Sequence, residues 1–470
     1  MTVSTRFTLF LCVVLFCIPA KAQGQVKDDG GAAIIAGSSP SYVRAMPRAI
    51  DPTQASQIPA LTSSTVLDFP ANAETSRDVF KTENGAGTAN SGAAFPKTFE
   101  DFDGDESLPD VRKSPLGGAI TGLDTVPTFQ GAFFHNSFFN FTMIGQHPLA
   151  GETTLIPAKI TEVSLTLLNA DGSVFKTVPF APFEDLTLDS PNFEEANYRS
   201  GRNIQFADAV QRAEFFHVMD GDWHTVLRQK VVNRVTITVP RFVNVRFPDG
   251  SIHQVRSYFT GTAADGNTFV LMLDLLFNFF FDNQVVGDIN AGNFLTKALN
   301  MSLFPNTFLF SLNRNNPNTP GGCCVLGFHT YYFQPGVDPQ PRWIAQFASW
   351  ISPGLFGPGF QDVTALSHET SEAFNDPFLN NATPSWQFPG VPANAKICQN
   401  NLETGDPVEV LPDATVALNI KERNEVFTYH PQTEALLQWF EMGTTSNAID
   451  GAFSFPNEAA LLHSALPCPP

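Results

Sequence analysis

The sequence carries little positive charge. Its 470 residues include 27 Lys and Arg against 46 Asp and Glu, which gives a formal net charge of −19. A nucleic-acid-binding protein needs clustered Lys and Arg to neutralise phosphates, and a global negative field repels polyanions and anionic lipid surfaces. We therefore expect no nucleic-acid partner. The hydrophobic fraction of 43% is enough for one or more cores.

Long apolar runs are also scarce, and the clearest one lies at the N-terminus. Arg6 precedes an apolar stretch from Phe7 to Ala20, and Ala20 and Ala22 supply the small residues of a cleavage site. This pattern is typical of a secretory signal peptide, here residues 1–22. The sequence thus predicts export to the extracellular space or the periplasm.

No second run of about 18 apolar residues follows, so we expect no membrane span in the mature chain. The nearest candidate, Thr268 to Phe281, is interrupted by Asp274 and Asn278. We interpret it as a buried strand or helix segment. The sequence predicts no particular oligomeric state.

Cysteines are few. Two of the six lie in the predicted signal peptide, and the mature chain keeps Cys323, Cys324, Cys398 and Cys468. An oxidising compartment allows these four to form disulfide bonds. Adjacent cysteines are strained partners for each other, so we expect bridges from Cys323 and Cys324 to Cys398 and Cys468.

Several enzyme signatures are missing altogether. The chain has no G-x-S-x-G elbow, no phosphate-binding P-loop and no dinucleotide fingerprint. Serine hydrolases of the elbow type, nucleotide triphosphatases and Rossmann enzymes are therefore excluded as interpretations. The adjacent cysteine pair also lacks the C-x-x-C spacing of a redox site.

The rest of the chain divides into three segments. Residues 23–116 are rich in small and polar residues without periodicity, which predicts a disordered or loosely packed linker. Residues 117–265 show strand patterns at Ile160 to Leu168 and Val231 to Val239, and a helical pattern at Ile204 to Met219. We expect an antiparallel β-sandwich-like domain there. Its predicted hairpin turns are Asn169 to Gly172, Asp249-Gly250 and Asp265-Gly266.

Residues 266–470 predict a second domain of mixed α/β character, so the expected class of the whole chain is α+β. Strand patterns at Thr307 to Leu312 and Cys324 to Phe333 precede a strong helical pattern. We expect Asp362 to cap this helix and Asp376-Pro377 to end it, because the residue before proline is disfavoured in a helix.

That helix contains Ser367-His368-Glu369-Thr370-Ser371-Glu372, an H-E-x-x-E sequence. His368 and Glu372 are one turn apart on the same face, where two ligand atoms can hold one metal ion. Glu369, offset by about 100°, can act as general base on a water at that metal. A solvated polar helix face would produce the same short pattern.

A third ligand has to come from outside the helix. The loop from Cys398 to Pro407 carries Glu403 and Asp406, and either could supply it. The alternative is a turn-stabilising pair, with Asp406 accepting from backbone amides. His329 and His430 are further candidates as ligand or oxyanion stabiliser, although a lone histidine is more often structural.

The run from Asp362 to Pro407 resembles a group of secreted, largely uncharacterised bacterial proteins. These share an S-H-E-x-x-E-x-x-x-D-P helix, a Trp, here Trp386, and a later acidic loop with a Cys. The helix is also similar to one in plant phosphate-induced, exordium-like extracellular proteins, and more remotely to gluzincin metallopeptidases such as thermolysin.

The metallopeptidase resemblance implies that His368 is a metal ligand and Glu369 the general base. It places Glu372 where that family has its second His. Carboxylate is an accepted zinc ligand, but it adds negative charge and raises the pKa of a bound water relative to a neutral imidazole. Glu403 would match in role the downstream glutamate ligand of gluzincins.

Two functional hypotheses follow. The first is a secreted zinc-dependent metallopeptidase-like enzyme acting on a protein or peptide, with zinc held by His368, Glu372 and either Glu403 or Asp406. Glu369 would deprotonate the attacking water. The second is a non-catalytic extracellular binding or surface protein with a degenerate or structural site, for calcium given the oxygen-rich donors.

Overall fold

The computed structural model describes most of the chain beyond residue 121 and short pieces before it. The predicted signal peptide and Cys468 lie outside the described residues. The described ranges are 31–36, 46–51, 61, 65–68, 122–134, 138–198, 203–216, 219, 221–313, 316, 320–357, 359–388, 398–409, 411–422, 425–441, 455 and 460–464.

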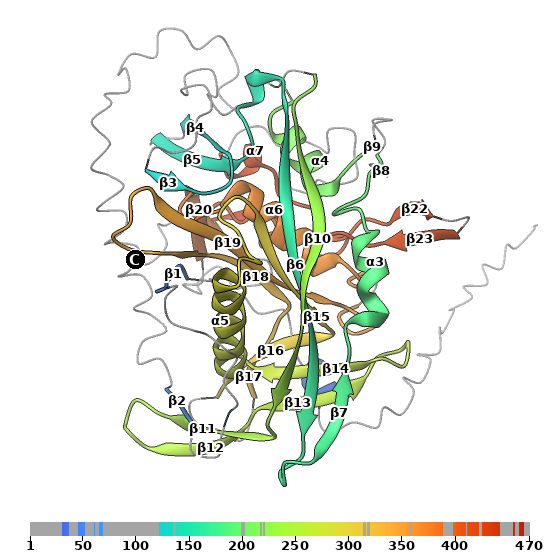
Figure 1. Cartoon of the computed structure of the whole chain (residues 1–470). Helices are drawn as coiled ribbons and strands as arrows, with labels where there is room; N and C mark the ends of the chain where they lie inside the picture. The colour runs from blue at the N-terminus through green and yellow to red at the C-terminus, as the bar shows by residue number, and fades with distance from the viewer. Residues whose placement is uncertain are drawn as a thin grey trace, which may run out of the picture.

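A mixed sheet of eight strands lies at the centre of the protein (Figure 1). Its order is β1-β18-β19-β15-β6-β10, with β3 added to β19 and β7 to β6. Three successive pairs in this order are parallel: β10 with β6, β6 with β15, and β15 with β19. Strand β18 is antiparallel to β19. The bounds are β1 Arg48–Ala49, β3 Leu123–Asp124, β6 Thr153–Leu168, β7 Val174–Val178, β10 His224–Val239, β15 Leu299–Pro305, β18 Gly327–Phe333 and β19 Gln340–Trp350.

The central sheet joins the two segments that the sequence analysis treated separately. The predicted strands at Ile160 to Leu168 and Val231 to Val239 are confirmed as parts of β6 and β10. These two long strands pair in parallel, and β6 also pairs with β15 of the following segment. Parallel strands need a long crossover, and helices α3 (Glu184–Leu188) and α4 (Phe206–Glu214) lie within it. The α+β class is confirmed, but a separate antiparallel sandwich is not.

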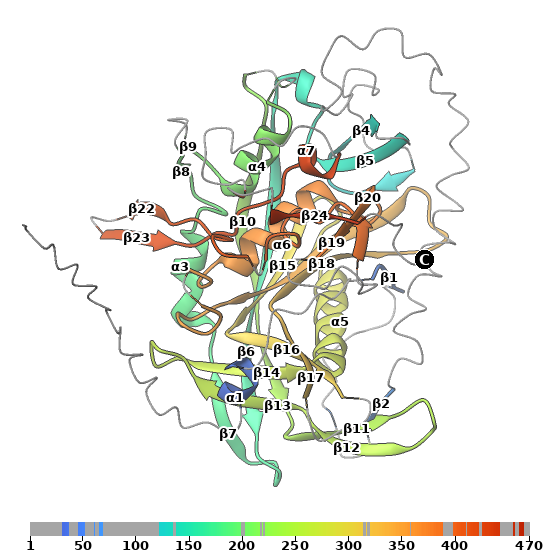
Figure 2. The ribbon, with the colours of Figure 1, turned by 180° about the vertical axis from the view of Figure 1, so that it is seen from behind.

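Two helices cover opposite faces of this sheet, as Figures 1 and 2 show from front and back. Helix α5 (Asp274–Asn290) packs Phe277 against Phe347, with ring centroids 4.4 Å apart. Helix α6 (Thr364–Asn375) buries Leu366 and Phe374 in a second apolar cluster with Ile344. Within the described residues, no helix has the combined length and apolar character needed to cross a membrane.

Strand alternation decides which side chains of β18 reach which helix. Successive residues of a strand point to opposite faces. Phe328 and Tyr332 therefore lie on the α5 side, where the Tyr332 hydroxyl donates to Asp282 at 2.7 Å. His329 and Tyr331 lie on the α6 side. This alternation places a histidine against the H-E-x-x-E helix.

A second sheet, β13-β14-β16-β17, lies below the first in Figure 1. Thr268 to Phe281, interpreted as strand or helix, is both, because β14 ends at Leu273 and α5 begins at Asp274. The three predicted turns are confirmed, with Gly172, Gly250 and Gly266 in the left-handed region. The bounds in this sheet are β13 Tyr258–Thr262, β14 Thr268–Leu273, β16 Thr307–Leu312 and β17 Pro320–Val325.

Smaller elements complete the fold. Among the described residues, three two-stranded and two three-stranded sheets accompany the two larger sheets. Their bounds are β4 Thr128–Phe134 with β5 Phe138–Ile144, β8 Ala196–Asn197 with β9 Asn203–Ile204, β11 Phe242–Arg246 with β12 Ile252–Arg256, β20 Ala382–Gln387 with β21 Cys398–Asn401 and β24 Leu462–His463, and β22 Leu418–Glu422 with β23 Glu425–Tyr429. Short helices are η3 Pro148–Ala150, η4 Ala181–Phe183 and α7 Leu437–Phe440.

Three short elements lie within the segment predicted to be a linker. Helix α1 (Gly31–Ala36) places Ile35 in the apolar core, β1 pairs with β18, and β2 (Val66–Asp68) pairs with β11. Backbone pairing to sheet edges orders β1 and β2 within a segment that has no periodic pattern of its own, and for the rest of residues 23–116 the linker stays a prediction.

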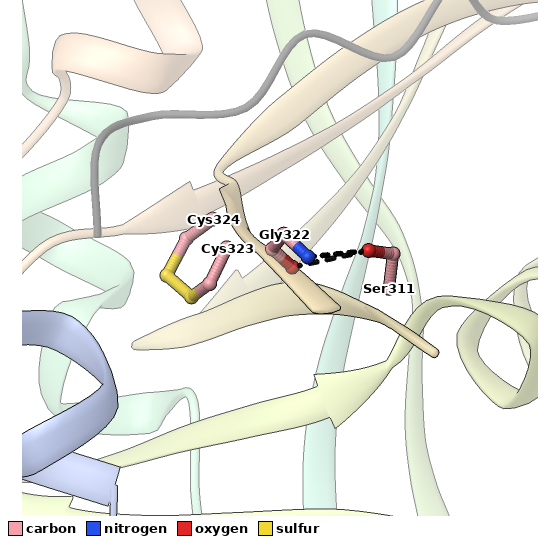
Figure 3. Close-up of a disulfide and its surroundings, with 4 residues drawn as sticks. All are labelled: Ser311, Gly322, Cys323 and Cys324. Atoms are coloured by element: carbon pink, nitrogen blue, oxygen red, sulfur yellow. Dashed lines mark hydrogen bonds between the residues drawn. A yellow bond between two sulfur atoms is a disulfide. The ribbon is translucent and has the colours of Figure 1, made fainter. Parts of the chain in front are cut away.

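The predicted disulfide pairing is also wrong for the adjacent cysteines. Cys323 and Cys324 are bonded to each other at the end of β17 (Figure 3). Both are buried in the core, and β17 is held on β16, where the amide of Gly322 donates to Ser311 Oγ at 2.7 Å. Cys398, which is disulfide-bonded as well, begins β21 in a different sheet. Pairing of β17 with β16 thus keeps Cys323 and Cys324 apart from Cys398.

Candidate metal centre

Helix α6 carries the centre, and all twelve of its residues are buried. The helix begins after Asp362, a residue in the left-handed region with φ 49°. Asp362 Oδ1 accepts from the amides of Val363 and His430, and Oδ2 lies 2.7 Å from His430 Nδ1. The predicted cap is therefore corrected, because Asp362 ties the start of the helix to the end of β23. This pairing makes His430 a structural residue.

The C-terminal end of α6 is confirmed at Asp376, before Pro377. Asp376 Oδ1 accepts from the amides of Asn380 and Asn381 at 2.8 and 3.0 Å. This turn directs the chain away from the sheet and toward β20. It also leaves the Asp376 carbonyl oxygen facing β18.

The H-E-x-x-E residues converge as their helical spacing predicts. His368 Nε2 lies 3.1 Å from Glu372 Oε2 and 3.9 Å from Glu369 Oε1. The three side chains are almost fully buried. The alternative interpretation, a solvated polar helix face, is therefore wrong.

His329 of β18 approaches the same carboxylates from the sheet. Its Nδ1 lies 3.6 Å from Glu369 Oε2 and 3.6 Å from Glu372 Oε2. On its other side, Nε2 is 3.1 Å from the carbonyl oxygen of Asp376. From the sequence alone, His329 was a further candidate as ligand or oxyanion stabiliser, outside the predicted ligand set of His368, Glu372 and Glu403 or Asp406. It comes within reach because β18 runs directly beneath α6.

The acidic loop after β21 closes the centre on its other side. Glu372 Oε1 accepts from the amides of Gly405 and Asp406 at 3.1 and 3.3 Å. Asp406 Oδ1 then lies 3.6 Å from His368 Nε2, whereas Glu403 Oε2 lies 3.9 Å from His329 Nε2. The two candidate third ligands thus face different histidines.

Two glycines permit this close packing. A Cβ on Gly405 would lie 2.5 Å from His368 Nδ1, and a Cβ on Gly327 would lie 2.6 Å from Glu369 Oε1. Either side chain would displace a residue of the centre. The absence of a Cβ at both positions lets a loop and a strand press directly against the α6 side chains.

Burial and mutual charge shift the pKa values of the cluster. Burial alone would lower the pKa of each histidine, but Glu372 beside His368 and Glu403 beside His329 raise both pKa values well above normal. Burial raises the pKa of Glu369 and, with the charge of Glu372, that of Asp406. At Glu372 burial is outweighed by the histidines, and its pKa falls to about 2. The centre therefore favours bound cations, either protons or metal ions.

The donor set suits a divalent metal ion. Among the described residues, two sets of three have ligand atoms within 4.8 Å of one another: His368, Glu369 and Glu372, and His329, Glu372 and Glu403. Glu369 Oε2 is buried without a hydrogen-bond partner. An unsatisfied buried carboxylate oxygen is costly, so its position is consistent with a cation or a water at the centre.

Comparison with protein-family models, curated protein sequences and solved structures finds no match for this chain.

Proposed function

We propose that the protein is a secreted, metal-dependent hydrolase of the metallopeptidase type. His368, Glu372 and Asp406 would bind zinc, and Glu369 would act as general base. The resemblance of α6 to the helix of secreted H-E-x-x-E proteins and, remotely, of gluzincins supports this assignment. The N-terminal signal-peptide pattern supports export.

One observation carries the proposal. His368 Nε2 lies 3.1 Å from Glu372 Oε2 and 3.6 Å from Asp406 Oδ1, so two carboxylates face the same imidazole nitrogen. Nitrogen and carboxylate ligands around zinc have metal–ligand bonds of about 2.0 to 2.2 Å, so ligand atoms lie roughly 3 to 3.6 Å apart. The imidazole favours zinc over calcium, which takes oxygen ligands.

The metal ion, Glu369 and Asp406 would have different roles in the reaction. A bound zinc ion would supply Lewis-acid chemistry, lowering the pKa of a water and polarising a peptide carbonyl. Glu369 Oε1, 3.9 Å from His368 Nε2, is placed to accept a proton from that water, and burial already raises its pKa. Asp406, whose side chain is 16% exposed, is the most open member of this set. Substrate would therefore approach over the acidic loop.

Burial favours a second candidate function. The side chains of His368, Glu369 and Glu372 are 8%, 6% and 4% exposed, and closed metal sites are more often structural than catalytic. The second candidate is a non-catalytic extracellular binding protein in which the ion, zinc or calcium, fixes α6 to the acidic loop.

Elemental analysis of the purified mature protein tests the metal. We expect stoichiometric zinc in the wild type and the loss of one equivalent in His368→Ala, because that substitution removes the imidazole ligand. His253→Ala, which alters an exposed histidine on β12, is the matched control and should keep the wild-type zinc content. Bound calcium alone, or no metal, would contradict the proposal.

Glu369→Gln separates the two candidates. Because the amide cannot accept the proton, we expect zinc to be retained and the rate of casein cleavage to fall by roughly 10²-fold or more. Glu152→Gln, at an exposed position, should cleave at the wild-type rate. Zinc binding by a wild-type protein that cleaves nothing would favour the structural role, and unchanged cleavage in Glu369→Gln would refute the assigned base.

A further inference from the structure

His329 is a buried histidine that the proposed single-metal site does not use. Its side chain is 3% exposed. A carbonyl oxygen can only accept, so the 3.1 Å contact from Nε2 to the carbonyl of Asp376 requires a proton on Nε2. A neutral ring then presents the lone pair of Nδ1 to Glu369 and Glu372. Metal-binding histidines commonly have this arrangement, with the second nitrogen donating to a backbone carbonyl.

Glu372 connects the two histidines through a single oxygen. Oε1 is occupied by the amides of Gly405 and Asp406. Oε2 lies 3.1 Å from His368 Nε2 and 3.6 Å from His329 Nδ1. An unprotonated Nδ1 facing a carboxylate oxygen is repulsive unless a cation lies between them. The same oxygen is therefore placed to contact one cation on each side.

The grouping of the side chains points the same way. Two sets of three described residues, His368 with Glu369 and Glu372 and His329 with Glu372 and Glu403, bring their ligand atoms within 4.8 Å of one another, and Glu372 belongs to both sets. The ion pairs described for Glu369, Glu372 and Asp406 are all with histidine. Buried charge that no cation compensates is strongly unfavourable.

We propose that the centre binds two divalent metal ions, one held by His368 and Asp406 and the other by His329, through Nδ1, and Glu403, with Glu372 Oε2 shared by both. This inference rests on the proposed function and extends it. Two-metal hydrolase sites place their ions about 3.5 to 4 Å apart. Glu369 lies between the two positions, with Oε1 3.9 Å from His368 Nε2 and Oε2 3.6 Å from His329 Nδ1.

Metal stoichiometry of the mature protein tests the proposal. After saturation with zinc and removal of free ion, the wild type and His253→Ala should each retain two equivalents, and His329→Ala one. Glu403→Gln preserves side-chain size and should also retain one equivalent. This second variant tests the proposal even if His329→Ala fails to fold. One equivalent in the wild type would overturn the second ion while leaving the proposed function intact. No bound metal would overturn both.

Cobalt substitution provides a readout independent of activity. Two Co²⁺ ions that share a carboxylate oxygen should be magnetically coupled, so the electron paramagnetic resonance signal per ion should fall as the second equivalent is added. In His329→Ala and Glu403→Gln the signal should grow in proportion to the single bound ion. A wild-type signal that grows linearly through two equivalents would contradict the shared Glu372 oxygen.

Discussion

At the residue scale, the geometry of the centre depends on the absence of a side chain at Gly405 as well as on the ligands. Gly405 donates its amide to Glu372, and its Cα lies against the imidazole of His368. The carbonyl oxygen of Gly405 also accepts from Gln432 Nε2 at 2.7 Å. Backbone contacts on both sides leave the glycine little room to move away from the histidine.

Gly405→Ala should therefore weaken metal binding without removing a ligand. The new Cβ would lie 2.5 Å from His368 Nδ1 and must displace the ring or the loop. We expect zinc affinity to fall by about tenfold or more, measured by competition with a chelator, as for other changes that misorient a ligand. Gly221→Ala is the control, because its Cβ would meet nothing within 4 Å. Wild-type affinity in Gly405→Ala would show that the loop can adjust.

At the element scale, strand alternation and helix starts determine which residues meet. The pattern of β18 gives no sign of which face His329 occupies, because both faces of this strand are buried and the residues are apolar on both. The start of α5 shows a similar ambiguity. The apolar run continues from β14 into the helix, and only Asp274 marks the change.

Asp274 gives α5 a pH-dependent contribution to stability. Burial raises its pKa from 3.8 to about 6, although its carboxylate accepts from the amide of Leu275. Because the folded-state pKa exceeds the unfolded value, the protonated form favours folding. This contribution is present below about pH 4 and is lost as pH rises through about 6.

Asp274→Asn should remove this dependence. The amide keeps an acceptor for Leu275 and carries no charge, so we expect the free energy of unfolding to rise by about 2 kcal/mol at pH 8 and to change little at pH 4. Denaturant unfolding at the two pH values measures the difference. Asp222→Asn, at an exposed position, should change stability little at either pH. Equal effects of Asp274→Asn at both pH values would contradict the assigned cause.

At the scale of the whole molecule, one sheet unites chain segments with different sequence patterns. Strand β15 lies between β6 and β19, so the centre of the sheet includes residues from both sides of the predicted boundary at 265/266. The apolar cluster on the α6 side likewise combines Ile160 of β6 with Leu299 of β15. Each segment by itself would expose an apolar sheet face and a strand edge.

Expression of residues 117–265 and 266–470 as separate chains tests this interdependence. We expect neither to unfold cooperatively on heating, because each lacks neighbours of the central sheet, whereas we expect a sharp transition for a chain that contains both segments. Circular dichroism at increasing temperature measures it. A cooperative transition in either fragment would indicate that this segment forms an independent domain.

The sequence by itself determined local features: the strands at Ile160 to Leu168, Val231 to Val239 and Thr307 to Leu312, three glycine turns, and the end of α6 at Asp376. Periodicity and turn chemistry are encoded by neighbouring residues. Helical spacing alone likewise predicts that His368 and Glu372 lie side by side, because residues four apart share one face of a helix.

Only the tertiary structure decided what depends on distant pairing. Parallel pairing of β6 with β10 and β15, and the approach of His329 to Glu372, join residues that are far apart in the sequence. Glu403 and Asp406 were equivalent in the sequence, and the backbone contacts of the loop with Glu372 direct them to different histidines. Long-range register is set by the burial of whole faces, and no local pattern reports it.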